Sequence, residues 1–157
     1  MYIIIITMKK KQEKTVTIND AKVNNLGGKK CYMRSTYLSM YLDTNSVGDV
    51  YFSSTNTNKW EFTKTDLDGA YFIKHIPTQL YLTANEKGDL FTAMELNSTF
   101  QKWYVHTSSE PEIYAYQNCC NELYFGVSLH GDIYLNEKDE NSAKTGLIYT
   151  FQFFPKK

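Results

Sequence analysis

The fold is indicated by residues 79–91, which have the sequence QLYLTANEKGDLF. The tyrosine-leucine pair at Tyr81 lies seven residues before Gly88, and short alternating apolar runs stand on either side of the polar segment 85–88. This pattern predicts two strands joined by a tight hairpin. A glycine at its turn fits, because such turns need a residue that tolerates positive φ.

The same spacing occurs three times along the chain. The copies are 40 and then 43 residues apart and run from Tyr41 to Gly48, from Tyr81 to Gly88, and from Tyr124 to Gly131. A second aromatic anchor follows each copy, at Trp60, at Trp103 and, more weakly, at Phe151. Matching registers of this kind indicate an internal repeat of about 40 residues.

Each copy is expected to contribute four strands. The expected ranges are 29–34, 38–43, 49–54 and 58–64, then 70–75, 79–84, 89–93 and 100–106, then 112–117, 122–128, 132–136 and 147–154. Twelve short strands in three copies predict an all-β fold, the β-trefoil, in which six strands form a barrel that three hairpins close at one end. A propeller is disfavoured, because three blades fall below the roughly four to eight that propellers have. We therefore expect a lead-in, partly ordered, over 1–28 and a trefoil over 29–157, with repeats near 29–68, 69–110 and 111–155.

Composition excludes several functional classes. The formal charge is zero, with 17 Lys and Arg against 17 Asp and Glu, which argues against a nucleic-acid or anionic-membrane partner. No apolar run approaches the roughly 20 residues that span a bilayer. The apolar start (residues 2–6) precedes its lysines and lacks the order of a secretory signal, so we expect a cytoplasmic protein or release without a signal peptide.

The sequence offers no recognisable catalytic or metal-binding motif. His75, His106 and His130 are widely separated, and Cys31, Cys119 and Cys120 form neither a disulfide framework nor a metal-binding pair. We therefore expect no enzyme activity, no metal and no cofactor. Trp60 and Trp103 are interpreted as core residues, and the repeated Gly-Asp pairs as turn residues.

Two segments carry a family resemblance. Gln101-Lys102-Trp103 and Asn58-Lys59-Trp60, together with the order of elements over 68–90, resemble the ricin B-type lectins, which have a Gln-x-Trp signature late in each trefoil repeat. The chain departs from that family at Phe151, where tryptophan is expected, and lacks the frequent disulfides within repeats. The resemblance implies a carbohydrate-binding module, alone or in a toxin or haemagglutinin assembly.

The resemblance also implies where a sugar would bind. In that family an aspartate soon after the Tyr-Leu strand pairs with an aromatic platform and with an Asn or Gln near the Gln-x-Trp. Here only the first repeat has the acid, since Thr83 and Gly126 replace it in the other repeats. The ligand-binding candidates are Asp43, Tyr51 or Phe52 as the aromatic platform, and Asn58. The alternative is that Asp43 is an ordinary turn acid.

Residues 70–92 also resemble fibroblast growth factors, as does Lys144-Thr145-Gly146. The acidic segment 136–141 does not fit the heparin site of that family. This resemblance keeps a second hypothesis open, a protein-binding trefoil such as a leaderless cytokine, a growth-factor-like ligand or a fascin-type adaptor. A trefoil inhibitor using the loops at 53–57, 94–99 or 136–146 is a third possibility.

Overall fold

The computed structural model describes residues 17–36, 38–55, 58–128, 131–137 and 150–155, the last range as backbone only. The apolar start, the motif Lys144-Thr145-Gly146 and most of the loop 136–146 lie outside the described residues. Among the described residues there is no helix long and apolar enough to cross a membrane.

Strands dominate the described chain. Its elements, in order, are β1 (Ile18–Lys22), β2 (Lys30–Ser35), β3 (Tyr41–Thr44), β4 (Val50–Ser53), β5 (Trp60–Lys64), β6 (Ala70–His75), β7 (Tyr81–Ala84), β8 (Leu90–Ala93), the 3₁₀ helix η1 (Thr99–Gln101), β9 (Trp103–Ser108), β10 (Ile113–Asn118), β11 (Tyr124–Val127), β12 (Ile133–Asn136) and β13 (Thr150–Pro155).

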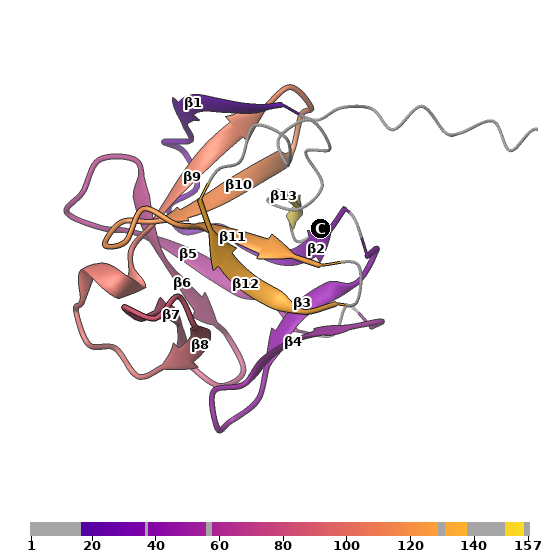
Figure 1. Cartoon of the computed structure of the whole chain (residues 1–157), viewed down its shortest axis with the longest axis vertical. Coiled ribbons are helices and arrows are strands. Elements are labelled where there is room, and N and C mark those ends of the chain that lie inside the picture. The colour runs from indigo at the N-terminus through magenta and orange to yellow at the C-terminus, as the bar shows by residue number, and fades with distance from the viewer. Residues whose placement is uncertain (1–16, 37, 56–57, 129–130, 138–149, 156–157) are drawn as a thin grey trace, which may run out of the picture.

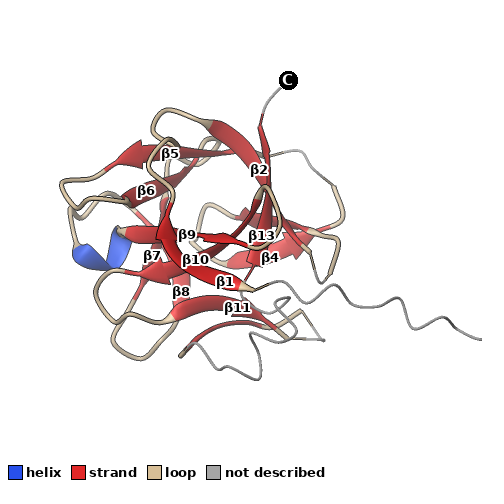
Figure 2. Cartoon of the chain, turned by 90° about the horizontal axis from the view of Figure 1, so that it is seen from above, coloured by secondary structure: helices blue, strands red, loops and turns tan. Residues whose placement is uncertain are grey.

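Six of these strands close into a barrel. The order β9-β10-β13-β2-β5-β6 is completed by pairing of β6 with β9, so the ring has no free edge. The hairpins β3–β4, β7–β8 and β11–β12 pair with β2, β6 and β10, respectively. Figure 1 shows the β3–β4 and β7–β8 hairpins in the lower half of the molecule and β11–β12 near its centre, and Figure 2 shows the barrel from above. The fold is the predicted all-β trefoil.

The strand register places the three copies in equivalent positions. Tyr41, Tyr81 and Tyr124 each pair with the barrel strand that precedes their hairpin. The tryptophan positions match in the same way: Trp60 pairs with the end of β6, Trp103 with the end of β10, and Phe151 with the end of β2. The sequence spacing therefore reflects structural equivalence.

The repeated Gly-Asp pairs form turns, as predicted. In the first hairpin, the side-chain oxygen of Asn45 accepts the N–H groups of Val47 and Asp49, and its amide donates to the Asp49 carboxylate. Asn85 makes the same bonds in the second hairpin. In the third, the Ser128 hydroxyl accepts the Asp132 N–H. Such side-chain bonds stabilise turns.

The matched apolar residues fill the barrel. Trp60 and Trp103 are fully buried, as predicted, among residues such as Leu42, Phe62 and Leu82. Each indole N–H donates to the carbonyl of the leucine in the neighbouring hairpin, Trp60 to Leu42 and Trp103 to Leu82, both at 3.0 Å. These bonds tie each hairpin to the barrel.

The described part of the lead-in packs against the barrel. Strand β1 pairs with β9 on the outside of the barrel (Figure 1). Ile18, Val23 and Leu26 are buried. The lead-in is thus an additional layer of the fold, and it creates a surface that the three repeats alone would not have.

Candidate functional site

The first repeat brings three of the four sequence-predicted site residues together. Asp43 on β3 pairs directly with Tyr51 on β4, and facing side chains of such a pair lie on the same side of a hairpin. Asn58, just before β5, donates its amide N–H to the Asp43 Oδ2 atom at 2.7 Å. The Tyr51 hydroxyl approaches the same oxygen at 3.5 Å, at the limit of a hydrogen bond.

Phe52 is directed differently. It pairs with Leu42 on the neighbouring strand and packs against the main core. Because successive side chains of a strand alternate between faces, it cannot share the face of Asp43 and Tyr51. The aromatic surface beside Asp43 is therefore that of Tyr51, which is 42% exposed.

The other carboxylate oxygen of Asp43 contacts a backbone N–H and a buried histidine. Its Oδ1 atom accepts the backbone N–H of Thr44 at 2.9 Å and lies 2.7 Å from the Nε2 atom of His75. Asp43 is 6% exposed and His75 is 1% exposed. The carboxylate is thus fixed in orientation by partners on both oxygens, and only a small part of it faces solvent.

His75 is a site residue that the sequence did not identify. Burial lowers its pKa, and the Asp43 carboxylate opposes that shift. At neutral pH the imidazole is therefore neutral. Its Nδ1 atom accepts the Thr78 backbone N–H at 3.4 Å and lies 2.8 Å from the Thr78 hydroxyl, so its proton resides on Nε2 and is donated to Asp43.

Comparison of the equivalent positions in the three repeats shows that His75 also has a structural role. Its equivalents, Ser35 and Asn118, are both buried and both accept a backbone N–H from the turn that follows them. These turns contain matching residues with positive φ: Ser39 (54°), Gln79 (62°) and Glu122 (62°). His75 is the turn-capping residue of its repeat, and it additionally reaches Asp43.

Tyr51 keeps its proton in this site. Partial desolvation raises the pKa of its hydroxyl, and the nearby Asp43 carboxylate raises it further. The hydroxyl therefore remains a hydrogen-bond donor at neutral pH. Its ring lies beside the carboxylate and is partly exposed.

The second repeat has no comparable site. Thr83 replaces Asp43, and Gln101 of the Gln-x-Trp motif is fully buried. The Gln101 amide donates to the Met94 carbonyl at 2.7 Å and to the Thr83 hydroxyl at 3.2 Å, and its oxygen accepts the Leu96 N–H at 2.8 Å. This glutamine holds the loop between β8 and η1 and has no group left for a ligand.

The third repeat lacks the acid as well, since Gly126 stands at the position of Asp43. Tyr149, which corresponds to Asn58, lies outside the described residues. Within the described ranges, no three His, Cys, Asp or Glu side chains gather into a possible metal site. The described contacts of the Asp43 carboxylate are hydrogen bonds.

A groove of about 650 Å³ borders Tyr51, and both polar and apolar atoms line it. It lies between the loop preceding β3, strand β4 and the edges of the other two hairpins, and it is lined by Leu38, Met40, Leu90 and Ile133 among others. Two further apolar side chains, Met94 (73%) and Leu96 (63%), are exposed on the loop that Gln101 holds. Apolar groups of this kind are typical of contact surfaces.

No protein-family model matches the sequence, and no curated protein sequence matches it. Solved structures nevertheless share its fold. A GH43 β-1,3-galactosidase superposes with a TM-score of 0.67 and 19% identity over 89% of this chain, which spans only 29% of the galactosidase chain. SeviL bound to asialo-GM1 saccharide gives a TM-score of 0.65 at 17% identity, covering 81% of this chain and 97% of SeviL.

A designed protein, the three-fold symmetric ThreeFoil, is similar too. It gives a TM-score of 0.65 at 11% identity and covers 79% of this chain and 96% of its own. At such identities the similarity establishes the fold. The chain is thus a β-trefoil of the architecture found in a glycan-bound lectin and in a symmetric designed protein.

Proposed function

We propose that this trefoil is a non-enzymatic carbohydrate-binding module whose site is the Asp43, Tyr51 and Asn58 cluster of the first repeat. The observation that carries the proposal is an oriented carboxylate beside an exposed aromatic ring on one face of the β3–β4 hairpin. The solved structure of SeviL with a saccharide supports it, because SeviL has the same architecture over nearly its whole length. The ricin B-type resemblance is part of the same proposal.

The bonding pattern leaves room for a sugar hydroxyl. The Asp43 Oδ2 atom has one short bond, from Asn58 at 2.7 Å, and one long contact, from Tyr51 at 3.5 Å. A sugar hydroxyl that replaces the long contact would make a stronger, charge-assisted hydrogen bond. The Asn58 Oδ1 atom, which accepts no hydrogen bond from the described residues, would accept a second hydroxyl.

The Tyr51 ring would cover the apolar face of the sugar, as aromatic rings do in such sites. His75 and Thr44 restrain the carboxylate, so little ordering is required when the sugar binds. The site is shallow, since its aromatic surface is a single ring. We therefore expect weak binding at one site and a gain in affinity from multivalent presentation.

The proposal includes the absence of catalysis. Thr78, His75 and Asp43 form a row of hydroxyl, imidazole and carboxylate, as in nucleophilic enzymes. However, the imidazole and the carboxylate are both buried, and the Thr78 hydroxyl also accepts the Leu80 N–H. These contacts support a role in holding the turn and the carboxylate.

Glycan-array screening followed by calorimetric titration tests the proposal. Tyr51→Ala should weaken binding of the selected glycan at least about tenfold, the equivalent of roughly 1.4 kcal/mol. Phe91→Ala is the matched control, because Phe91 is the equivalent of Tyr51 beside Thr83. The control should bind as the unmodified protein does. No glycan bound at millimolar concentration, or an equal loss in both variants, would rule the site out.

A second candidate function is protein binding. The groove beside Tyr51 and the exposed Met94 and Leu96 favour it, because protein interfaces are enriched in aromatic residues and methionine. Capture from cell lysate on the immobilised protein, followed by elution with free sugar, separates the two functions. A glycan ligand is released by sugar, whereas a protein ligand stays bound, and a protein held through the exposed loop is lost in a Met94→Ser, Leu96→Ser variant.

A further inference from the structure

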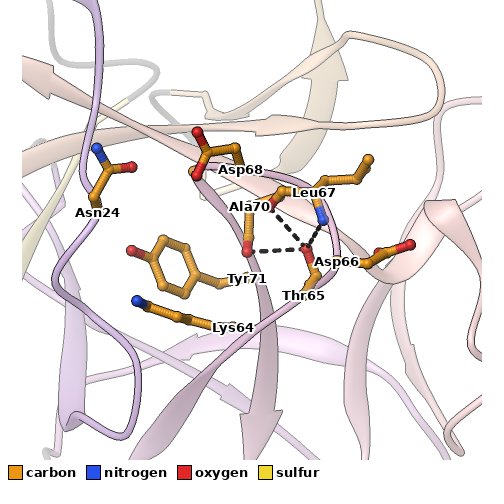
Figure 3. A pocket seen from close by; sticks show the side chains of 9 residues that line it. Asn24, Lys64, Thr65, Asp66, Leu67, Asp68, Ala70 and Tyr71 are labelled. Atoms are coloured by element: carbon orange, nitrogen blue, oxygen red, sulfur yellow. Dashed lines mark hydrogen bonds between the residues drawn. The ribbon is translucent and has the colours of Figure 1, made fainter.

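A separate pocket lies between the lead-in and the turn that joins β5 to β6. Its volume is about 170 Å³, and it is lined by Asn24 of the lead-in and by residues 64–71 of the hairpin. Figure 3 shows the side chains of Asn24, Lys64, Asp68 and Tyr71 around it. None of these residues belongs to the Asp43 cluster.

The two walls of the pocket are firmly joined. The buried hydroxyl of Tyr71 donates to the Val23 carbonyl at 2.7 Å and accepts the Leu26 N–H at 3.3 Å. The Gly28 N–H donates to the Phe62 carbonyl at 2.7 Å. These bonds connect segments more than thirty residues apart in sequence, so the pocket is formed before any ligand arrives.

A glycine on each wall allows the close approach. A Cβ atom at Gly27 would lie 2.9 Å from the Lys64 side chain, and one at Gly69 would lie 2.9 Å from the Lys22 side chain. Both contacts are shorter than real Cβ contacts. The absence of side chains at these two positions therefore lets the lead-in and the hairpin lie against each other with the pocket between them.

The two carboxylates at the pocket, those of Asp66 and Asp68, differ in whether they are available to bind a ligand. Asp66 accepts a 2.7 Å bond from the Lys102 ammonium, and Figure 3 shows its carboxylate directed away from the pocket. Asp68, Lys64 and Asn24 make no hydrogen bond or ion pair with the residues that the structure describes. The turn itself is held by the Thr65 hydroxyl, which bonds the backbone of Leu67 and Ala70.

The free groups suit a neutral polyhydroxylated ligand. One ammonium and one carboxylate balance each other, so the pocket does not favour a simple ion of either sign. A carboxylate accepts hydrogen bonds from adjacent hydroxyls, an ammonium donates them, and an amide does both. The pocket has a volume of about 170 Å³ and is open to solvent, so it can hold part of a pyranose unit while the rest of the sugar stays in water.

We propose that this pocket is a second saccharide subsite, which takes a single neutral pyranose unit through Asp68, Lys64 and Asn24. The inference rests on the proposed carbohydrate-binding function and adds a second point of attachment to it. Two sites on one rigid domain can engage two sugars of one glycan or surface, which raises the overall affinity without any new contact.

The neighbouring repeat provides a natural control. The turn between β9 and β10 is held in the same way, because the Ser108 hydroxyl bonds Glu110 and Ile113 as Thr65 bonds its own turn. There, however, the lead-in lies directly against the turn, through two bonds between Thr17 and Ser109. A substitution at Glu110 therefore changes a similar acidic turn that does not line this pocket.

The test is a titration of the isotope-labelled full chain with methyl glycosides of galactose, glucose, mannose and N-acetylgalactosamine up to tens of millimolar, followed by NMR. In a Tyr51→Ala background, amide shifts of residues 66–71 should still respond to a glycoside. Asp68→Asn should weaken that response about tenfold, and Glu110→Gln should not change it. Glycine, a zwitterion without hydroxyls, should cause no response.

The outcomes separate the two proposals. Binding that perturbs only the Asp43 and Tyr51 region and disappears in Tyr51→Ala would overturn the second subsite and leave the proposed function standing. A response of residues 66–71 to glycine as strong as to any glycoside would overturn the saccharide assignment. No response to any glycoside anywhere would overturn both. A response at residues 66–71 that survives Tyr51→Ala and weakens in Asp68→Asn supports the subsite.

Discussion

The first and second repeats share a framework and differ in one polar cluster. In both, the tryptophan N–H reaches the leucine carbonyl of the neighbouring hairpin at 3.0 Å, and the hairpin turn uses the same Asn and Asp bonds. At the position after that leucine, the first repeat has Asp43 with partners on both oxygens, whereas the second has Thr83. Only the first leaves an exposed ring beside a carboxylate.

Asn58 and Gln101, each two residues before its tryptophan, show that a small difference in sequence decides whether a repeat has the polar cluster. Asn58 is short, lies half-buried, and bonds Asp43. Gln101 is longer by one methylene and turns inward to hold the backbone at Met94 and Leu96. Shared residues therefore specify the barrel, and a binding site arises where one repeat deviates from the others.

The largest expected effect concerns the shared framework. Trp60→Ala and Trp103→Ala should each reduce the free energy of unfolding by about 3–5 kcal/mol, because each leaves a large cavity and an unpaired carbonyl. Urea denaturation measures both. Similar losses would support equal structural roles in the two repeats, and a loss below about 1 kcal/mol in either variant would contradict its place in the core.

The hairpin turns should respond unequally to the same substitution. Gly48 and Gly88 both have positive φ, 92° and 81°, so alanine at either costs about 1–2 kcal/mol. A Cβ atom at Gly48 would also lie 2.4 Å from the Thr92 carbonyl oxygen, whereas at Gly88 the nearest atom is 3.7 Å away. Gly48→Ala should therefore cost about 1–3 kcal/mol more than Gly88→Ala, as thermal or urea unfolding would show. Equal costs would mean that Gly48 does not lie against Thr92 of β8.

The polar cluster itself should contribute to stability. Asp43→Ala leaves the Thr44 N–H, the His75 Nε2–H and the Asn58 amide without their acceptor, and should reduce the free energy of unfolding by about 2–3 kcal/mol. Thr83→Ala removes the long bond from Gln101 and the 2.8 Å bond that the hydroxyl donates to the Tyr81 carbonyl, and should cost about 1 kcal/mol. If the two losses were equal, the carboxylate would not be the centre of a network.

The sequence predicted the elements that depend on local pattern. The Tyr-Leu to Gly spacing identified all three hairpins, because period-two alternation and a turn glycine are local signals. The ricin B-type resemblance suggested Asp43 with Tyr51 or Phe52 as the aromatic platform, and the register of the hairpin pairs Asp43 with Tyr51. Phe52 could have been excluded on the same alternation, as it is one residue out of phase with Asp43.

The remaining site residues depend on contacts distant in sequence. His75 is 32 residues from Asp43, and its equivalents, Ser35 and Asn118, are chemically unlike it, so no shared motif marks the position. Only the 40- and 43-residue spacing could have indicated that it caps a turn. The pocket at Asp68 depends on the bonds between Tyr71 and the lead-in, and the lead-in lies outside the repeat from which the fold was inferred.

The smallest expected effect is the change of the free energy of unfolding with pH. Measuring this change tests whether His75 is neutral in the folded protein. Burial lowers the pKa of His75 and of His106, so the unfolded chain, whose histidines titrate near about 6.5, binds protons more readily than the folded protein. The free energy of unfolding should therefore fall as the pH drops below about 6.5, and the fall should level off below the lowered folded pKa values. Denaturant midpoints between about pH 5 and pH 7 measure this change above the range in which carboxylates titrate.

His75→Asn separates the two histidines, because asparagine is the residue found at the equivalent position in the third repeat and can accept the turn N–H. The variant should show a shallower pH dependence, with the remainder due to His106. A free energy of unfolding that instead rises on acidification in the unmodified protein, and does not do so in His75→Asn, would mean that Asp43 holds a protonated imidazole. The cluster would then contain an ion pair. The first repeat would differ from the second by two buried charges, one on Asp43 and one on His75, rather than by the Asp43 carboxylate alone.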